Sequence, residues 1–409
     1  METIMETTVV IAGGGPAGAM LGLLLARAGI DLVLLEKHAD FFRDFRGDTI
    51  HPSTIQVLDE LDLLDDFNAI PHREFASFGL YTGEEVVPLA DFRGLPGRFR
   101  RLAMVPQWDF LKLITDAAGK HPNFRMMMET RAVGVIREGD AVRGVRAESD
   151  GRVTEIRAAL TVAADGRQSD LRAAVGLKPV DIGAPMDVLW FRLPRHDGHP
   201  DDVFLRPGRG TALVSINRGD YWQMAYLIPK GGYDGLRARG IDAFRTGITG
   251  LLPYLDPSGL TFDDVRLLTV IVDRLPKWHL PGLLVIGDAA HAMSPIGGVG
   301  INLAIQDAIA AANLVTGPLQ RAQANRRPVL DPVPGSLLAK LRRRRWYPTA
   351  ATQAVQVQIQ NRIIARVLAG DADAGAILAA ARRIPPPVRH LMGRAIGLGF
   401  LPEHVRSSH

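Results

Sequence analysis

The sequence predicts an α/β protein, α+β overall, in which a Rossmann-like domain carries an inserted antiparallel sheet and is followed by C-terminal helices. Three observations support this fold class. An apolar strand runs into a glycine-rich turn near the N-terminus, two later apolar strands end in Asp165 and Asp288, and aromatic, partly alternating segments lie between those two strands. A strand, a glycine turn and a helix in direct succession are typical of the start of a dinucleotide-binding βαβ unit.

The composition is that of an ordinary globular protein. The chain has 409 residues, enough for two or three domains, with 47% hydrophobic and 22% charged residues. It has no cysteine, which excludes a disulfide framework and a Cys-ligated metal, and we expect no metal site. The net charge of +4 is small and predicts no nucleic-acid partner. A cytoplasmic protein fits these properties.

Residues 8–26 carry no charge and are long enough for a membrane helix. The run Gly13-Gly14-Gly15-Pro16 interrupts this stretch early, so a buried strand followed by a buried helix is favoured. Glu2 and Glu6 precede the stretch, and no Lys or Arg does, which argues against a secretory signal. We therefore expect no stable membrane insertion.

The first element is a buried parallel strand over Thr8–Ala12, because the run is apolar and β-branched. The glycines that follow match G-x-G-x-x-G. Gly13 permits the tight turn, Gly15 lets the backbone approach a pyrophosphate, and Gly18 lets the next helix pack closely on the strand. That helix, from Ala17 to about residue 28, directs its N-terminal N–H groups at the phosphates.

The second strand, Asp31–Leu35, ends at Glu36. A carboxylate at this position can accept hydrogen bonds from an adenosine ribose, and it disfavours a 2′-phosphate. FAD or NAD is therefore preferred over NADP here. A lone glycine motif is as often a plain turn, but the strand, helix, second strand and acid in the expected order favour a dinucleotide site.

Two later strands narrow the choice to FAD. Residues 160–165 form a strand that ends in Asp165-Gly166, which by itself is only a tight turn. Residues 283–288 form another strand, and its terminal Asp288 can accept a hydrogen bond from a ribityl hydroxyl. Glycines at 297–300 then permit close approach to a flat ring. A helix beginning near Ile301-Asn302 directs its N-terminus to where a reduced flavin carries negative charge.

Over roughly residues 7 to 320 these motifs resemble the FAD-dependent aromatic hydroxylases, the group A flavoprotein monooxygenases similar to p-hydroxybenzoate hydroxylase and the ubiquinone-pathway hydroxylases. The resemblance implies FAD as cofactor, NADH or NADPH as a transient co-substrate, O2, and an aromatic or other electron-rich small molecule. The FAD contacts that it implies are Gly13, Gly15, Pro16, Ala17, Gly18, Glu36, Arg46, Gln107, Val133, Asp165, Gly166, Asp288, Gly298, Gly300, Ile301 and Asn302.

The resemblance also implies hydroxylation through a flavin hydroperoxide. No second G-x-G-x-x-G follows a strand, so the nicotinamide would be held transiently in a surface groove, with Asp165 and Gly166 serving both it and FAD. The sequence identifies no catalytic base. His51, His291 and Pro295 are the candidates on the flavin side, although a lone histidine is more often structural.

The expected domains are discontinuous: residues 1–75, 98–180 and 266–330 bind FAD, residues 76–97 and 181–265 form a substrate-binding β-sheet, and residues 331–409 are helical. The aromatic and methionine side chains expected to line an apolar pocket for a planar ring are Trp190, Trp222, Met224 and Tyr226, with Phe204 beside them. For any one of them a place in the core is the more common outcome.

Several alternatives stay open. The basic run Lys340–Trp346 could touch a membrane surface, but a solvated helix face is favoured. The same fold also serves reductases or dehydrogenases without oxygen insertion, halogenases, and flavin carriers without turnover. Residues 222–229 only loosely match the Trp-x-Trp-x-Ile-Pro of halogenases, which argues against that chemistry. The protein is expected to be a monomer or a homodimer.

Overall fold

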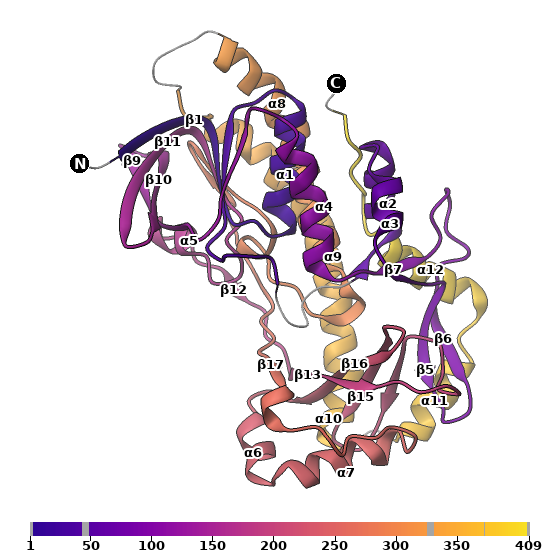
Figure 1. Ribbon diagram of the computed structural model, residues 1–409. Helices are drawn as coiled ribbons and strands as arrows, with labels where there is room; N and C mark the ends of the chain where they lie inside the picture. The colour runs from indigo at the N-terminus through magenta and orange to yellow at the C-terminus, as the bar shows by residue number, and fades with distance from the viewer. Residues whose placement is uncertain (1–2, 43–48, 325–330, 372, 407–409) are drawn as a thin grey trace.

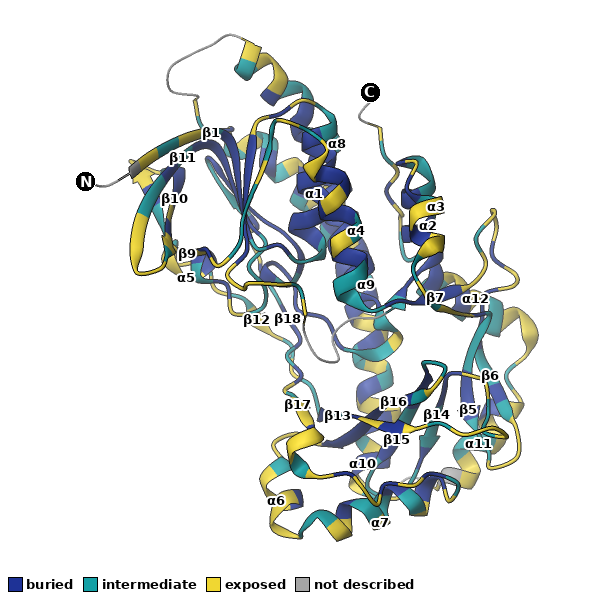
Figure 2. Cartoon of the chain, viewed as in Figure 1, coloured by how far each residue is buried: buried dark blue, intermediate teal, exposed yellow. Residues whose placement is uncertain are grey.

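The computed structural model describes residues 3–42, 49–324, 331–371 and 373–406. Two large sheets dominate them, one near each end of the molecule, and a long C-terminal helix runs between the two (Figure 1). The buried residues gather in the strands of both sheets and in the helices packed on them (Figure 2). The α/β fold class predicted from the sequence is confirmed.

The first sheet is built around parallel strands. They lie in the order β8-β2-β1-β11-β20, which places the N-terminal strand in the middle. The central strands are mostly buried and correspondingly apolar, whereas β8 at the edge is only partly buried. Their bounds are β1 Thr3–Ala12, β2 Leu32–Leu35, β8 Phe124–Met127, β11 Arg152–Ala163 and β20 Leu283–Val285.

Shorter elements extend this sheet and surround its edges. A hairpin of β9 and β10 pairs antiparallel with β11, and β19 pairs with β20. The bounds are β9 Arg131–Glu138, β10 Ala141–Ser149, β19 His279–Leu280, β3 Thr49–Ile50, β4 Arg73–Phe75, β7 Leu102–Met104, β12 Val180–Asp181, β18 Asp273–Arg274, α2 Pro52–Glu60, α3 Leu64–Ala69 and α5 Asp170–Ala174.

Three helices pack together beside the central strands: α1 (Pro16–Arg27), α4 (Gln107–Gly119) and α8 (Gly300–Ala324). The stretch Ile296–Ala324 is long and apolar enough to cross a membrane by length and composition, yet 78% of its apolar window is buried inside the protein. Packing against α1 accounts for that apolarity, because a helix covered on most sides needs few polar residues.

The second sheet has seven strands in the order β17-β13-β16-β15-β14-β5-β6. Strands β5 and β6 come from an early segment of the chain and join strands that follow about a hundred residues later. The chain thus enters this sheet twice, and the domain bounds given above stay a prediction. The bounds are β5 Ser77–Tyr81, β6 Val86–Asp91, β13 Met186–Pro194, β14 Phe204–Pro207, β15 Ala212–Asn217, β16 Tyr221–Pro229 and β17 Arg266–Leu268.

One face of this second sheet is covered by α6 (Tyr233–Ala238) and α7 (Ile241–Leu251), which share an apolar core with it. The other face is turned toward the first sheet (Figure 1). Aromatic side chains such as Trp222 and Phe244 fill the core on the helix-covered face. The opposite face is therefore the one left to line a cavity.

The C-terminal helices close the space between the sheets. Helix α9 (Gly335–Ile359) continues through a π-helical turn at Gln360–Ile364 into α10 (Ala365–Ala369). Helix α9 contacts α8, and α10 contacts β16. Helices α11 (Ala374–Arg382) and α12 (Pro386–Gly397) pack on β6. A π-helical turn inside an α-helix often marks a functional region.

The basic run on α9 is only partly the solvated face that the sequence predicts. Arg345 is buried, with its Nε 3.1 Å from Asp307 Oδ1 and its Nη1 3.6 Å from Glu403 Oε1. Arg344 also pairs with Glu403. The expectation is thus wrong for Arg345, because α9 turns this side chain toward the carboxylates of α8 and the C-terminal segment.

Candidate active site

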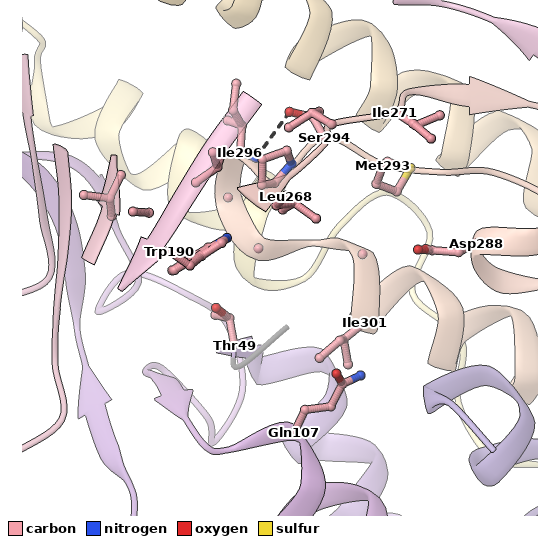
Figure 3. A pocket seen from close by; sticks show the side chains of 18 of the residues that line it. Thr49, Gln107, Trp190, Leu268, Ile271, Asp288, Met293, Ser294, Ile296 and Ile301 are labelled. Atoms are coloured by element: carbon pink, nitrogen blue, oxygen red, sulfur yellow. Dashed lines mark hydrogen bonds between the residues drawn. The ribbon is translucent and has the colours of Figure 1, made fainter. Parts of the chain in front are cut away.

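A cavity of about 1500 Å³ lies between the two sheets. Single small-molecule sites usually measure about 300–1,000 Å³, so this cavity has room for a dinucleotide and a second molecule together. In Figure 3, Trp190 from the second sheet stands across from Gln107, Asp288 and Ile301, which come from the first-sheet side. The cavity thus joins the glycine motifs to the open face of the second sheet.

Most of the predicted cofactor residues meet in this cavity, although they come from distant parts of the chain. Those that line it are Gly13, Gly15, Pro16, Ala17, Glu36, Gln107, Asp165, Gly166, Asp288, Gly298, Gly300 and Ile301. Those that follow β1, β2, β11 and β20 gather because these parallel strands end on the same edge of the first sheet, where open α/β sheets bind ligands.

The glycine turn is shaped for a phosphate group. At Gly13 the backbone φ is +106°, and an added Cβ would stand 2.3 Å from the Ala164 carbonyl oxygen. At Gly15 an added Cβ would meet nothing within 4 Å, so the space beside this residue is open. Helix α1 begins there without a capping side chain, which leaves its first N–H groups for a ligand. The turn fits the pyrophosphate of a dinucleotide.

Glu36 is held in place at the end of β2. Its two carboxylate oxygens accept the N–H groups of Gly14 at 3.0 Å and of His38 at 3.1 Å. The side chain is buried and lines the cavity. A carboxylate oxygen has more than one lone pair, so Glu36 can also accept a ribose hydroxyl.

Two aspartates follow the next strands along the same edge. Asp165 accepts the Leu171 N–H at 3.2 Å through Oδ2, whereas its buried Oδ1 has no hydrogen-bond partner within the described residues. Burial raises the pKa of Asp165. Asp288, in the 3₁₀ turn Gly287–Ala289, lies 3.4 Å from Arg167 Nη2 and is partly exposed to the cavity. Both carboxylates can accept a further hydrogen bond from a ligand hydroxyl.

Three of the predicted FAD contacts lie elsewhere. Gly18 packs beneath the turn, where an added Cβ would stand 1.9 Å from the Gly13 carbonyl oxygen. Val133 is 39% exposed on β9 and does not line the cavity, although residues 130–132 do. Asn302 is buried and accepts hydrogen bonds from the His51 N–H and the Thr54 hydroxyl. Arg46 lies outside the residues that the structure describes.

His51 and His291 do not line the cavity, so the structure does not support either as a catalytic base. His51 is fully buried, its Nδ1 lies 2.7 Å from the Ile396 carbonyl oxygen, and burial lowers its pKa to about 4. His291 is buried with Nε2 2.6 Å from Asp307. Of the three candidates, only Pro295 reaches the cavity.

Asp307 is the centre of a buried charge network behind the flavin-side turn. It contacts His291 and Arg345 and also accepts the Gly287 N–H at 3.2 Å. Burial acts to raise the pKa of Asp307, but His291 and Arg345 together hold it below its ordinary value. The network therefore ties the residue before Asp288 to α8 and α9.

The four side chains predicted to contact substrate lie on different faces of the second sheet. Trp190 lines the cavity. Trp222, Met224 and Tyr226 are buried on the opposite face, against α6 and α7. Successive strand residues point to opposite faces, so the neighbouring positions on β16 line the cavity instead: Gln223, Ala225 and Leu227.

The C-terminal helices also contribute to the cavity, which the sequence did not predict. Ile359, Arg362 and Ile363 from the end of α9 and its π-helical turn line the cavity, as do Ile377 from α11 and Met392 from α12. No local pattern in the sequence marks them as cavity residues. Helix α9 runs along the space between the two sheets (Figure 1).

A family model described as an FAD binding domain matches residues 6–326. The chain is 34% identical over 327 residues to 6-methylpretetramide 4-monooxygenase from Streptomyces rimosus, covering 79% of this chain and 78% of that protein. It is 28% identical over 328 residues to digeranylgeranylglycerophospholipid reductase from Thermoplasma volcanium, covering 76% and 78%. The solved structure of the OxyS anhydrotetracycline hydroxylase from Streptomyces rimosus matches with a TM-score of 0.73 at 20% identity, over 96% of this chain and 76% of that one.

Proposed function

Because this chain belongs to the FAD binding domain family, we propose that it uses NADH or NADPH and O2 to hydroxylate a polycyclic aromatic substrate of the polyketide type. The resemblance to FAD-dependent aromatic monooxygenases that the motifs indicated is confirmed, and the protein is an FAD-dependent monooxygenase. The nicotinamide and the polyketide substrate are the parts that we propose.

The observation that supports the proposal best is the cavity between the two sheets. Its first-sheet end carries the glycine turn, Glu36, Asp165 and Asp288, and its other end is an apolar sheet face. When bound, FAD supplies hydride acceptance and oxygen activation. We infer that the glycine turn and α1 hold its pyrophosphate, Glu36 its adenosine ribose and Asp288 its ribityl chain.

The substrate end suits a broad planar molecule. Trp190 and Ala225 are register partners on β13 and β16 and both line the cavity, so a large ring stands beside a small side chain. Val214 lies beside Ala225 on β15, and Leu268 and Ile377 add to the apolar lining. An apolar, water-poor wall binds aromatic rings and protects a reactive oxidant from water.

The test is a turnover assay with the FAD-loaded protein across phenols, quinolones and tetracyclic polyketides. NADH and NADPH oxidation, hydrogen peroxide and product mass are followed together. We expect a polycyclic phenol to stimulate oxidation and to gain one oxygen atom, which carries the label when isotopically labelled O2 is supplied. Oxidation that yields only peroxide with every compound would contradict the proposal.

A reductase is the second candidate, because a relative at 28% identity carries that name. It is less supported than hydroxylation, since the relative at 34% identity is a monooxygenase. In the same assay a reductase would add two hydrogen atoms to its substrate and would not need O2. We further propose that the enzyme is cytoplasmic and acts as a monomer or homodimer. Sedimentation of the purified protein tests the oligomeric state.

A further inference from the structure

The segment Ala292–Ile296 is an irregular stretch of chain between the turn that carries Asp288 and the glycine turn before α8. Its residues Met293, Ser294, Pro295 and Ile296 line the cavity, as Figure 3 shows for three of them. An irregular buried segment makes no ladder of its own, so its carbonyl groups must find donors elsewhere. The source of those donors decides where the segment lies.

Three glutamines on α9 and its π-helical turn supply most of them. Gln353, Gln356 and Gln360 are 1%, 3% and 0% exposed. Their spacing places them on one face of the helix, a position that apolar residues usually occupy. Burying a side-chain amide is unfavourable unless it is hydrogen-bonded, so three buried glutamines on one helix face indicate a specific structural role.

Each glutamine side chain donates a hydrogen bond to the segment, and Gln353 also donates one to Asp273. Gln353 Nε2 donates to the Asp273 carbonyl at 2.8 Å and to the Ala292 carbonyl at 3.1 Å. Gln356 Nε2 donates to the Ser294 carbonyl at 3.0 Å and to the Ile296 carbonyl at 2.7 Å. A carbonyl can only accept, so these partners fix the orientation of both amides.

Gln360 completes the row. Its Nε2 donates to the Ser294 hydroxyl at 2.8 Å, and that hydroxyl oxygen also accepts the Ile296 N–H at 3.3 Å. None of the three glutamines lines the cavity, whereas the segment that they hold does. Their effect on the site therefore passes through the backbone of Ala292–Ile296.

We propose that Gln353, Gln356 and Gln360 are positioning residues that set the place of the Ala292–Ile296 segment against the flavin. This inference rests on the proposed function for the identity of the cofactor side of the cavity. It assigns a positioning role at the flavin site to α9, which follows the residues that the family model matches. Gln356 is the central member, because it alone bridges two carbonyls within the segment.

The test replaces Gln356 with methionine, which has a similar length and helix propensity but no N–H donor. The FAD-loaded variant should bind FAD nearly as well as the parent, since the glycine turn, Glu36 and Asp288 are unchanged. The flavin absorption and circular dichroism bands and the flavin midpoint potential should shift. Coupled turnover should fall about 10- to 100-fold while peroxide release rises, because a small misplacement of the reacting groups has effects of that size.

Gln358→Met is the matched control, since Gln358 is exposed on the same helix. It should leave the spectrum, potential and coupling at parent values. Gln360→Met, which loses one bond to a side chain, should give a smaller shift than Gln356→Met. If Gln356→Met does not fold, Gln360→Met and Ser294→Ala carry the test. Both remove the same bond, so their effects on the potential should not add.

The proposal is overturned if Gln356→Met, or Gln360→Met in its place, has the spectrum, potential and peroxide yield of Gln358→Met. A drop in melting temperature with an unchanged flavin would likewise leave only a structural role. The spectrum and the potential need no substrate. A parent enzyme that fails to hydroxylate any compound therefore refutes the proposed function, and leaves this test of the glutamines intact.

Discussion

Gly15 and Gly18 belong to one motif, but substitutions at the two positions should affect different properties, FAD binding at Gly15 and stability of the fold at Gly18. Gly15 has φ −72° and ψ −177°, a conformation open to any residue, and a Cβ there meets no atom within 4 Å. Gly18 lies inside α1, where a Cβ would stand 1.9 Å from the Gly13 carbonyl oxygen. We expect Gly15→Val to spare the apoprotein and to weaken FAD binding, and Gly18→Ala to destabilise the fold itself.

The magnitudes follow from these contacts. At Gly15 the added side chain intrudes into the space for the pyrophosphate, and overpacking of about 1–3 kcal/mol corresponds to FAD binding weaker by about 5- to 150-fold. At Gly18 overpacking of about 1–3 kcal/mol exceeds the gain of up to about 1 kcal/mol from helix propensity. The obstacle is backbone rather than a flexible side chain, so we expect the upper part of that range and a melting temperature lower by roughly 2–8 °C.

The assay has two parts on the same preparations. Thermal unfolding of the apoproteins measures the fold, and titration with FAD, followed by quenching of its fluorescence, measures the dissociation constant. The reasoning is refuted if Gly15→Val binds FAD as tightly as the parent, or if it lowers the apoprotein melting temperature as much as Gly18→Ala does.

Three further predictions concern single side chains. Asp288→Ala should lose most of its FAD and keep its melting temperature, since its one ion pair is partly exposed; a variant as yellow as the parent would contradict this. Burial holds the pKa of His51 at about 4 against 6.5 when unfolded, so stability present above pH 6.5 should fall by about 3 kcal/mol between pH 6.5 and 4. His51→Gln should show a shallower loss over that window in denaturant titrations at each pH. Ala225→Phe should lower turnover of polycyclic substrates at least tenfold, about 1.4 kcal/mol, with FAD retained, whereas Met224→Leu on the opposite face should not.

The flavin half of the site could be predicted from the sequence because its signals are local. A strand, a glycine turn and a helix are encoded by neighbouring residues, and parallel strands that end in Glu36, Asp165 and Asp288 must meet at one sheet edge. Val133 does not line the cavity, because its strand is part of an edge hairpin on which this side chain faces outward. Asn302 does not line it either, because its amide oxygen accepts hydrogen bonds from the His51 N–H and the Thr54 hydroxyl at the start of α2.

The substrate half depended on the tertiary structure. Strand β16 is buried on both faces, so no alternation in Tyr221–Pro229 tells which face meets the cavity. Packing of α6 and α7 assigned Trp222 and its alternate neighbours to the core, and left Ala225 for the substrate. Likewise, the place of His291 in the structure depends on Asp307 of α8, which contacts it, and on Arg345 of α9, which contacts Asp307.

The fold class and the glycine turn of the flavin side followed from the amino-acid sequence, since hydrophobic period and glycine placement act over a few residues. The sheet face that lines the cavity, and the contact of Gln356 with a segment sixty residues earlier in the chain, appeared only in the folded molecule. These depend on contacts between elements far apart in sequence, and a single chain read in order carries no local pattern for such contacts.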